Sequence, residues 1–168
     1  MQLAEAADRQ ARGLGQLAAI AQLREEHDNM RAALQWALDH GEMEIVIRIS
    51  GALGWFWDMH NCLSEGRRWL AAALAADAGV DAEFRARAYT SAGVLASDQN
   101  DFEIAAQMFD QGLALYREID DQSGVAYVLS YVGRMLRCQG EYGAAQARLN
   151  ESVAMFEQLG DRRGAAYA

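Results

Sequence analysis

Residues 93–127 read GVLASDQNDFEIAAQMFDQGLALYREIDDQSGVAY, and residues 133–167 read GRMLRCQGEYGAAQARLNESVAMFEQLGDRRGAAY. The two stretches match when one is shifted against the other by a fixed offset of 40. The matching pairs are Gly93/Gly133, Gln99/Gln139, Phe102/Tyr142, Ala105/Ala145, Ala114/Ala154, Tyr116/Phe156, Asp121/Asp161, Gly124/Gly164 and Tyr127/Tyr167. At an offset of 39 the pattern continues back into residues 54–70. A period of this size indicates stacked supersecondary units.

Each unit is expected to form two helices. In the central unit, apolar residues recur at three- and four-residue spacings, which predicts a buried helix face: Ile104, Ala105, Met108, Phe109, Gly112, Leu113 and Tyr116. Asn61, Asn100 and Gly140 hold equivalent places and predict turns with a left-handed residue. Asp121 and Asp161 predict the N-caps of the helices that open the next units. We expect an all-α fold, a right-handed α-solenoid of antiparallel helix pairs with a 39–40-residue period.

The solenoid divides into a cover and repeats. Residues 1–41 predict covering helices, one over 2–12 that Gly13 and Gly15 interrupt, and a longer one over Gln16–Asp39 that packs on the first repeat. The repeats are expected at 42–80, 81–121 and 122–163, with 164–168 opening a truncated fourth, all in one structural domain. Residues 77–81 form the loosest link. We expect a piece of a larger protein, whose uncovered terminal repeat drives homo-oligomerisation.

Composition excludes several classes of function. The 168 residues include no Pro and no Lys, so a phosphate-loop or Schiff-base lysine is absent. A net charge of −9 disfavours direct nucleic-acid binding. Neither a membrane span nor a signal peptide is visible, which predicts a cytoplasmic protein with no membrane partner. Cys62 and Cys138 are expected to be free, buried thiols.

Four positions in each unit carry small and large apolar residues in a fixed order. They are Gly93, Phe102, Ala105 and Phe109 in the central unit, then Gly133, Tyr142, Ala145 and Leu149, and earlier Gly54, Leu63, Gly66 and Leu70. This pattern resembles the tetratricopeptide repeat, although that family has a period of about 34 residues. Asp-x-x-Gly stands at the junctions in place of the family's Pro. The resemblance implies a partner-binding array whose first helices line a concave groove.

Three further stretches narrow the resemblance. They are Asp28-Asn29-Met30-Arg31-Ala32-Ala33-Leu34, Leu63-Ser64-Glu65-Gly66-Arg67-Arg68-Trp69-Leu70 and Asp161-Arg162-Arg163-Gly164-Ala165-Ala166-Tyr167. They resemble the repeat region of bacterial signal-transduction ATPases with numerous domains, including LuxR-type transcriptional regulators. The resemblance implies a sensor for a protein, peptide or small effector that controls an ATPase module.

By analogy with the repeat family, the groove is expected to be lined by the first helices. The candidate residues are Arg48, Trp55, Asp58, Met59, Arg87, Thr90, Val94, Ser97, Asp98, Tyr127, Ser130, Tyr131, Arg134 and Arg137. Arg134 and Arg137 share a helix face, so they could grip an anionic effector; the alternative is a solvated pair. Trp57 is expected to be core, with Trp55 facing the groove.

Catalytic and metal sites are not expected. His60 and Cys62 would need distant partners to form a zinc site, and His27 lacks the other ligands of a phosphohydrolase. No phosphate loop or nucleophile elbow is present, and no cofactor is implied. Two alternatives to the sensor remain: a structural scaffold for self-assembly, and a peptide-pheromone receptor. The receptor ranks low because the four Asn residues, at positions 29, 61, 100 and 150, lie off the predicted groove.

Overall fold

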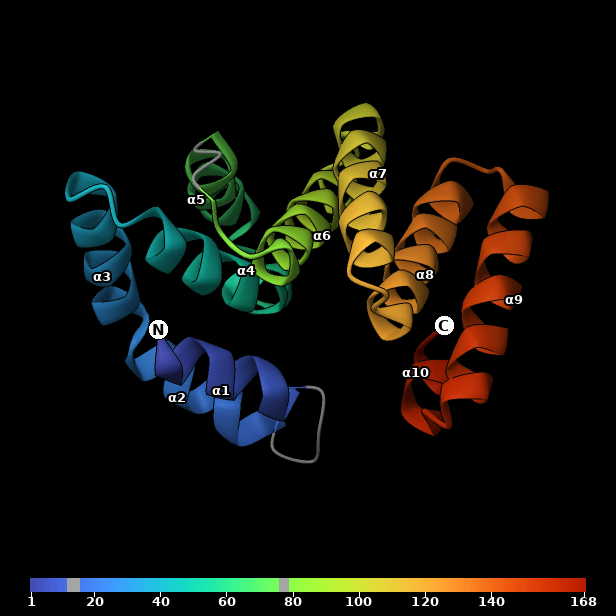
Figure 1. The fold of residues 1–168 in the computed structure, drawn as a ribbon, viewed down its shortest axis with the longest axis horizontal. Coiled ribbons are helices and arrows are strands. Elements are labelled where there is room, and N and C mark those ends of the chain that lie inside the picture. The colour runs from blue at the N-terminus through green and yellow to red at the C-terminus, as the bar shows by residue number, and fades with distance from the viewer. Residues whose placement is uncertain (12–15, 76–78) are drawn as a thin grey trace.

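A computed structural model describes residues 1–11, 16–75 and 79–168, and every regular element in these ranges is an α-helix. The helices are α1 (Gln2–Ala11), α2 (Gln16–Glu25), α3 (His27–Asp39), α4 (Met43–Met59), α5 (Leu63–Ala75), α6 (Ala82–Asp98), α7 (Phe102–Glu118), α8 (Gln122–Cys138), α9 (Tyr142–Leu159) and α10 (Arg162–Tyr167). They follow an arc in which each helix packs on its neighbours (Figure 1). The predicted all-α solenoid of packed helix pairs is confirmed.

Six turns between consecutive helices share one conformation. Asn61, Asn100 and Gly140 have φ of 55°, 61° and 82°, as the sequence predicts. At the Asn100 turn, the Asp101 amide donates to the Ala96 carbonyl at 2.9 Å, so the end of α6 is satisfied by the chain that leaves it. The same left-handed geometry occurs at Gly41, Asp120 and Gly160. Asp120 was not predicted, because an aspartate reads equally well as a helix-surface residue.

Asp121 and Asp161 cap the helices that follow them. The Asp121 carboxylate accepts a hydrogen bond from the Gly124 amide at 2.9 Å, and Asp161 accepts one from Gly164 at the same distance. These caps confirm the predicted helix starts. They also satisfy backbone donors that an uncapped helix would leave to water.

Large side chains occupy the places where glycines leave room in a neighbouring helix. A Cβ on Gly93 would lie 2.6 Å from the Phe109 ring, and one on Gly124 would lie 2.3 Å from Tyr116. Gly164 and Phe156 repeat the second arrangement at 2.4 Å. Close approach of the helices therefore depends on these small residues.

The N-terminal region differs from the prediction in one respect. The single helix expected over Gln16–Asp39 is two helices, α2 and α3, which meet at Glu26. Glu26 has φ −94° and ψ 4°, and its carboxylate accepts a hydrogen bond from Asn29. After the bend, the ring centroids of His27 and Phe56 are 5.3 Å apart. Leu23, before the bend, is buried. Gly13 and Gly15, and residues 77–78 of the loose link, lie outside the described residues.

The stretch Asp28–Leu34 joins the N-terminal helices to α5. Arg31 makes a bidentate contact with Glu65, whose Oε1 is 2.6 Å from the Arg31 Nε. Leu34 is buried at 1% exposure, and Ala37 behind it at 0%. Both hydrogen bonding and packing thus give this sequence run a structural role.

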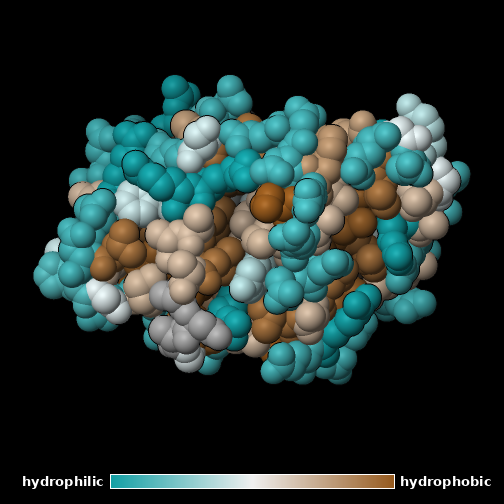
Figure 2. Space-filling model, turned by 90° about the horizontal axis from the view of Figure 1, so that it is seen from above, coloured by the Kyte–Doolittle hydropathy of each residue, from teal (hydrophilic) through white to brown (hydrophobic). Residues whose placement is uncertain are grey.

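The surface mixes polar and apolar side chains. Figure 2 shows one face on which hydrophobic patches lie between hydrophilic areas. Cys138 is exposed and Cys62 is half-buried, so the prediction of two buried thiols is wrong. Cys138 is the last residue of α8, where its side chain is accessible to solvent. No helix in the described ranges is long and apolar enough to cross a membrane.

Candidate functional site

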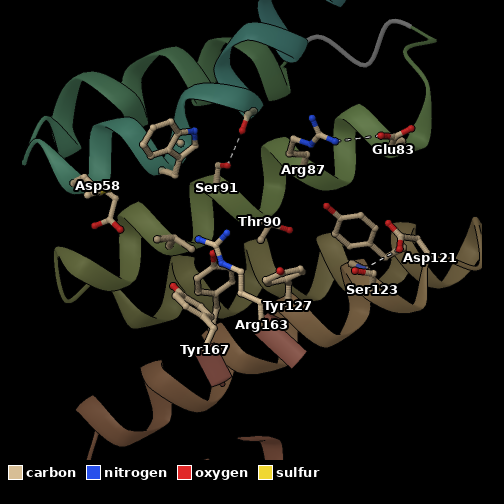
Figure 3. Close-up of a pocket in the computed structure, with 18 residues that line it drawn as sticks. Asp58, Glu83, Arg87, Thr90, Ser91, Asp121, Ser123, Tyr127, Arg163 and Tyr167 are labelled. Atoms are coloured by element: carbon tan, nitrogen blue, oxygen red, sulfur yellow. Dashed lines mark hydrogen bonds and ion pairs between the residues drawn. The ribbon is translucent and has the colours of Figure 1, made fainter. Parts of the chain in front are cut away.

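A groove of about 440 Å³ lies among the first helices of successive pairs (Figure 3). α4, α6 and α8 provide most of its lining, α10 adds Arg163 and Tyr167, and α7 adds Tyr116. A volume of this size is typical of pockets that take a small ligand or a few side chains of a partner.

Aromatic side chains from several helices line the groove. Trp55 comes from α4, Tyr127 and Tyr131 from α8, and Tyr167 from α10. The Tyr131 and Tyr167 rings meet edge to face at 6.0 Å, and Tyr127 packs edge to face on buried Phe156 at 4.8 Å. Aromatic rings held in this way offer large contact area at small entropic cost.

Close contact between α4 and α6 forms part of the groove lining. The Ser91 hydroxyl donates to the Gly51 carbonyl at 3.0 Å, and a Cβ on Gly54 would lie 2.2 Å from the Ser91 Oγ. Thr90, one residue earlier, donates to the Ala86 carbonyl at 2.8 Å. These hydroxyls are therefore committed to backbone carbonyls.

Charged side chains are partly paired. Arg87 contacts Glu83 at 3.2 Å within α6, and Asp121 is occupied as the cap of α8. These three charged side chains therefore already have partners within the protein. One acidic side chain of the groove, Asp58, has a raised pKa.

Asp58 and Asp98 meet where α4 and α6 end. Burial, and then a hydrogen bond and repulsion from Asp98, raise the pKa of Asp58 to about 6. The opposing cation is Arg134 of α8, whose attraction lowers this pKa only in part. Burial disfavours the charge of Arg134, but Tyr167, Asp98, Tyr131 and Asp58 raise its pKa overall. Arg134 also donates to the Tyr167 hydroxyl at 2.8 Å.

The structure brings together most of the predicted site residues. Eight of them line the main groove: Trp55, Asp58, Met59, Arg87, Thr90, Val94, Tyr127 and Tyr131. Four others, with Val94 and Tyr131 shared, line an adjacent hollow of about 80 Å³: Ser97, Asp98, Arg134 and Arg137. As predicted, Trp57 is buried, at 1% exposure.

Two predicted residues lie in neither hollow. Arg48 pairs with Glu5 of α1 at 2.7 Å and with Glu44 at 2.8 Å, because α1 packs back against α4. Ser130 is fully buried and donates to the Tyr127 carbonyl at 2.7 Å. Analogy between repeats predicts both residues in the groove, but it does not specify where a preceding helix docks or which side chains turn inward.

Ten lining residues were missed: Gly51, Gly54, Glu83, Ser91, Tyr116, Asp121, Ser123, Gly124, Arg163 and Tyr167. A signal existed for two of them. Arg163 and Tyr167 stand one full period after Ser123 and Tyr127, so the repeat itself places them on the groove side. Whether the other residues line the groove depends on how closely the helices approach one another.

Among the described residues, no group of three His, Cys, Asp or Glu side chains has suitable positions to hold a metal ion. His27 lies 3.5 Å from Glu65, and burial lowers the pKa of His60.

The peptide-pheromone receptor alternative calls for Asn side chains in the groove. No Asn lines either of the two described hollows.

Comparison with known families finds a match over part of the chain. The model of the tetratricopeptide repeat family matches residues 85–119, which cover most of α6 and all of α7. This helix pair is therefore similar to a tetratricopeptide repeat, and the match supports a protein-interaction region. No curated protein matches the chain.

Proposed function

We propose that the chain is a non-catalytic interaction and sensor domain that binds a protein or peptide segment in its concave groove. The observation that carries the proposal is the aromatic-lined groove of about 440 Å³, which spans successive helix pairs of a repeat array. Interaction surfaces are enriched in Tyr and Trp, and solenoids use their concave faces for binding.

The wider setting is a signal-transduction or transcriptional regulator with an ATPase module, in the cytoplasm of a bacterium. Its support is the sequence resemblance of Asp28–Leu34, Leu63–Leu70 and Asp161–Tyr167. In this setting the cover is 1–41 and the repeats are 42–80, 81–121 and 122–163. A bound segment would favour one curvature of the array and so shift the population of states in the neighbouring module.

The experiment is selection of peptides from a phage-displayed library, followed by binding in solution. Val94 lines both hollows, whereas Ala114 is exposed on α7 away from them. Selected peptides should bind at least about tenfold more weakly to Val94→Trp than to the wild type, because the indole fills the groove. Ala114→Trp adds the same side chain elsewhere and should bind as the wild type does.

Equal binding to both variants would place the peptide outside the groove and refute the proposal. Failure to select any peptide from a library of high diversity would also count against it. Circular dichroism of both variants shows whether the array stays folded.

A further inference from the structure

Aromatic rings line the groove on both sides of α6. Trp55 lines it from α4, and Tyr131 and Tyr167 line it from α8 and α10, while α6 runs between α4 and α8 (Figure 1). The Tyr131 and Tyr167 rings meet edge to face, and Tyr131 is also stacked on Phe109 with the ring centres 6.3 Å apart. Phe109 is 1% exposed, whereas Tyr167 is 50% exposed. The ring pair is therefore anchored on the core at one side and accessible to a further ring at the other.

Arginine side chains lie beside these rings. Arg163 extends from α10 into the groove (Figure 3). A guanidinium group donates hydrogen bonds in its own plane and can stack its face on an aromatic ring at the same time. Arg134 shows this combination, since it donates to the Tyr167 hydroxyl at 2.8 Å and its Cζ lies 5.6 Å from the centre of the Tyr131 ring. The groove thus offers both rings and guanidinium groups to an aromatic occupant.

The formal charges that line the two hollows cancel at neutral pH. Among the described residues, the acidic side chains are Asp58, Glu83, Asp98 and Asp121, and the basic side chains are Arg87, Arg134, Arg137 and Arg163. An occupant with a charge would lose its hydration without a net attraction in return. The lining therefore favours an uncharged side chain over a cationic or an anionic one.

We propose that the groove binds an uncharged aromatic side chain (Phe, Tyr or Trp) of the partner segment, seated on the Tyr131 and Tyr167 rings and beside Arg163. The inference rests on the proposed function, since it names the side chain that anchors the segment. The groove volume of about 440 Å³ accommodates such a ring together with neighbouring parts of a peptide. Aromatic anchors seated in pockets contribute much of the binding free energy at protein interfaces.

The test uses acetylated, amidated hexapeptide pools in which one position is fixed, measured by surface plasmon resonance on the immobilised protein at neutral pH and about 0.15 M salt. The peptides carry no fluorescent label, because a label would add a foreign ring. At one position, pools fixed as Phe, Tyr or Trp should bind the wild type at least about tenfold more tightly than pools fixed as Lys or Glu. They should bind at least about threefold more tightly than pools fixed as cyclohexylalanine, which is close to Phe in size but has no π electrons.

Two substitutions separate the ring of Tyr167 from its hydroxyl group. Tyr167→Leu should weaken the aromatic pools by about fivefold, because it removes one of the rings on which the anchor is seated. Tyr167→Phe keeps that ring and should bind as the wild type does. Tyr142→Leu is the matched control, since Tyr142 is 72% exposed on α9 and lines neither hollow, and it should also bind as the wild type does.

Equal binding of the aromatic and cyclohexylalanine pools to the wild type would overturn the inference, and so would tighter binding of a charged pool. Equal weakening by both Tyr167 variants would assign the effect to the hydroxyl group and would also overturn it. If pools bind without aromatic preference and Val94→Trp weakens them all, the groove binds peptides and only the aromatic inference fails. If Val94→Trp has no effect, the proposed function itself fails.

Discussion

The contact between Gly54 and Ser91 sets how closely α4 and α6 approach beside the groove. A Cβ on Gly54 would lie 2.4 Å from the Ser91 Cβ, whereas apolar carbon atoms pack at about 3.5 Å or more. Rotation of the Ser91 side chain cannot relieve this contact, because the backbone fixes its Cβ. Gly54→Ala therefore requires the two helices to separate by about 1 Å.

The energetic cost follows from three contributions. Overpacking costs about 1–3 kcal/mol, and loss of the hydrogen bond from Ser91 to the Gly51 carbonyl adds about 1 kcal/mol. The higher helix propensity of Ala returns about 1 kcal/mol. We expect Gly54→Ala to lower the free energy of unfolding by about 2 kcal/mol, which corresponds to a fall in Tm of roughly 4–8 °C.

Thermal unfolding followed by circular dichroism tests this, with Gly143→Ala as control. Nothing lies within 4 Å of a Cβ on Gly143 in α9, so this variant should be at least as stable as the wild type. Ser91→Gly should rescue Gly54→Ala because it removes the opposing Cβ, whereas Ser91→Ala should not. A Gly54→Ala protein as stable as the control, or equal rescue by both Ser91 variants, would refute the close approach.

Three further predictions concern charge and surface. Asp98→Asn should lower the pKa of Asp58 from about 6, as measured by its carboxyl carbon-13 shift; an unchanged value would assign the rise to burial alone. The pKa of Asp58 is higher in the folded than in the unfolded protein, so the stability that Asp58 contributes is complete below about pH 4 and is lost as pH rises through about 6. In urea unfolding, the free energy of unfolding of Asp98→Asn should therefore decline less over this pH range than that of the wild type. Arg31→Ala should lower the free energy of unfolding by about 1 kcal/mol, more than Arg148→Ala, which breaks an exposed pair with Glu151. Arg31 lowers the pKa of Glu65, so this difference should disappear as the pH falls through that lowered pKa; a difference that persists in acid would argue for packing instead. If the array self-associates through α9, where Leu159 is 48% and Tyr142 72% exposed, Leu159→Asp should reduce the concentration dependence of mass in sedimentation equilibrium; a wild type that is monomeric at all concentrations would contradict this.

Local chemistry made the helices and turns predictable. Asn100 and Gly140 adopt the left-handed conformation at a helix end at little steric cost, and Asp121 caps a helix through its own nearest backbone amides. Periodicity identified Phe109 as core, and it is 1% exposed. The break at Glu26 escaped prediction, since no Gly or Pro marks it.

The site was predictable only where one helix decides the direction of a side chain. The repeat placed Thr90, Val94 and Tyr127 on the groove side, and the structure places them there. The meeting of Asp58 with Asp98 depends on the crossing of α4 and α6, which a periodic pattern does not determine. For the same reason the sequence did not show that α1 would engage Arg48.

The glycine contacts described above have a consequence for the length of the array. Tyr116 against Gly124 joins one helix pair to the next, and Phe156 against Gly164 makes the same junction one full period later. Insertion of a second copy of residues 121–160 after Gly160 would keep the Phe156–Gly164 junction on the far side of the copy. On the near side it would place Phe156 against Gly124, which is the same arrangement of an aromatic ring on a glycine. Each added copy would contribute its own stability and one more interface with its neighbour. The chain could therefore be lengthened by whole periods that keep an aromatic ring against a glycine at every junction.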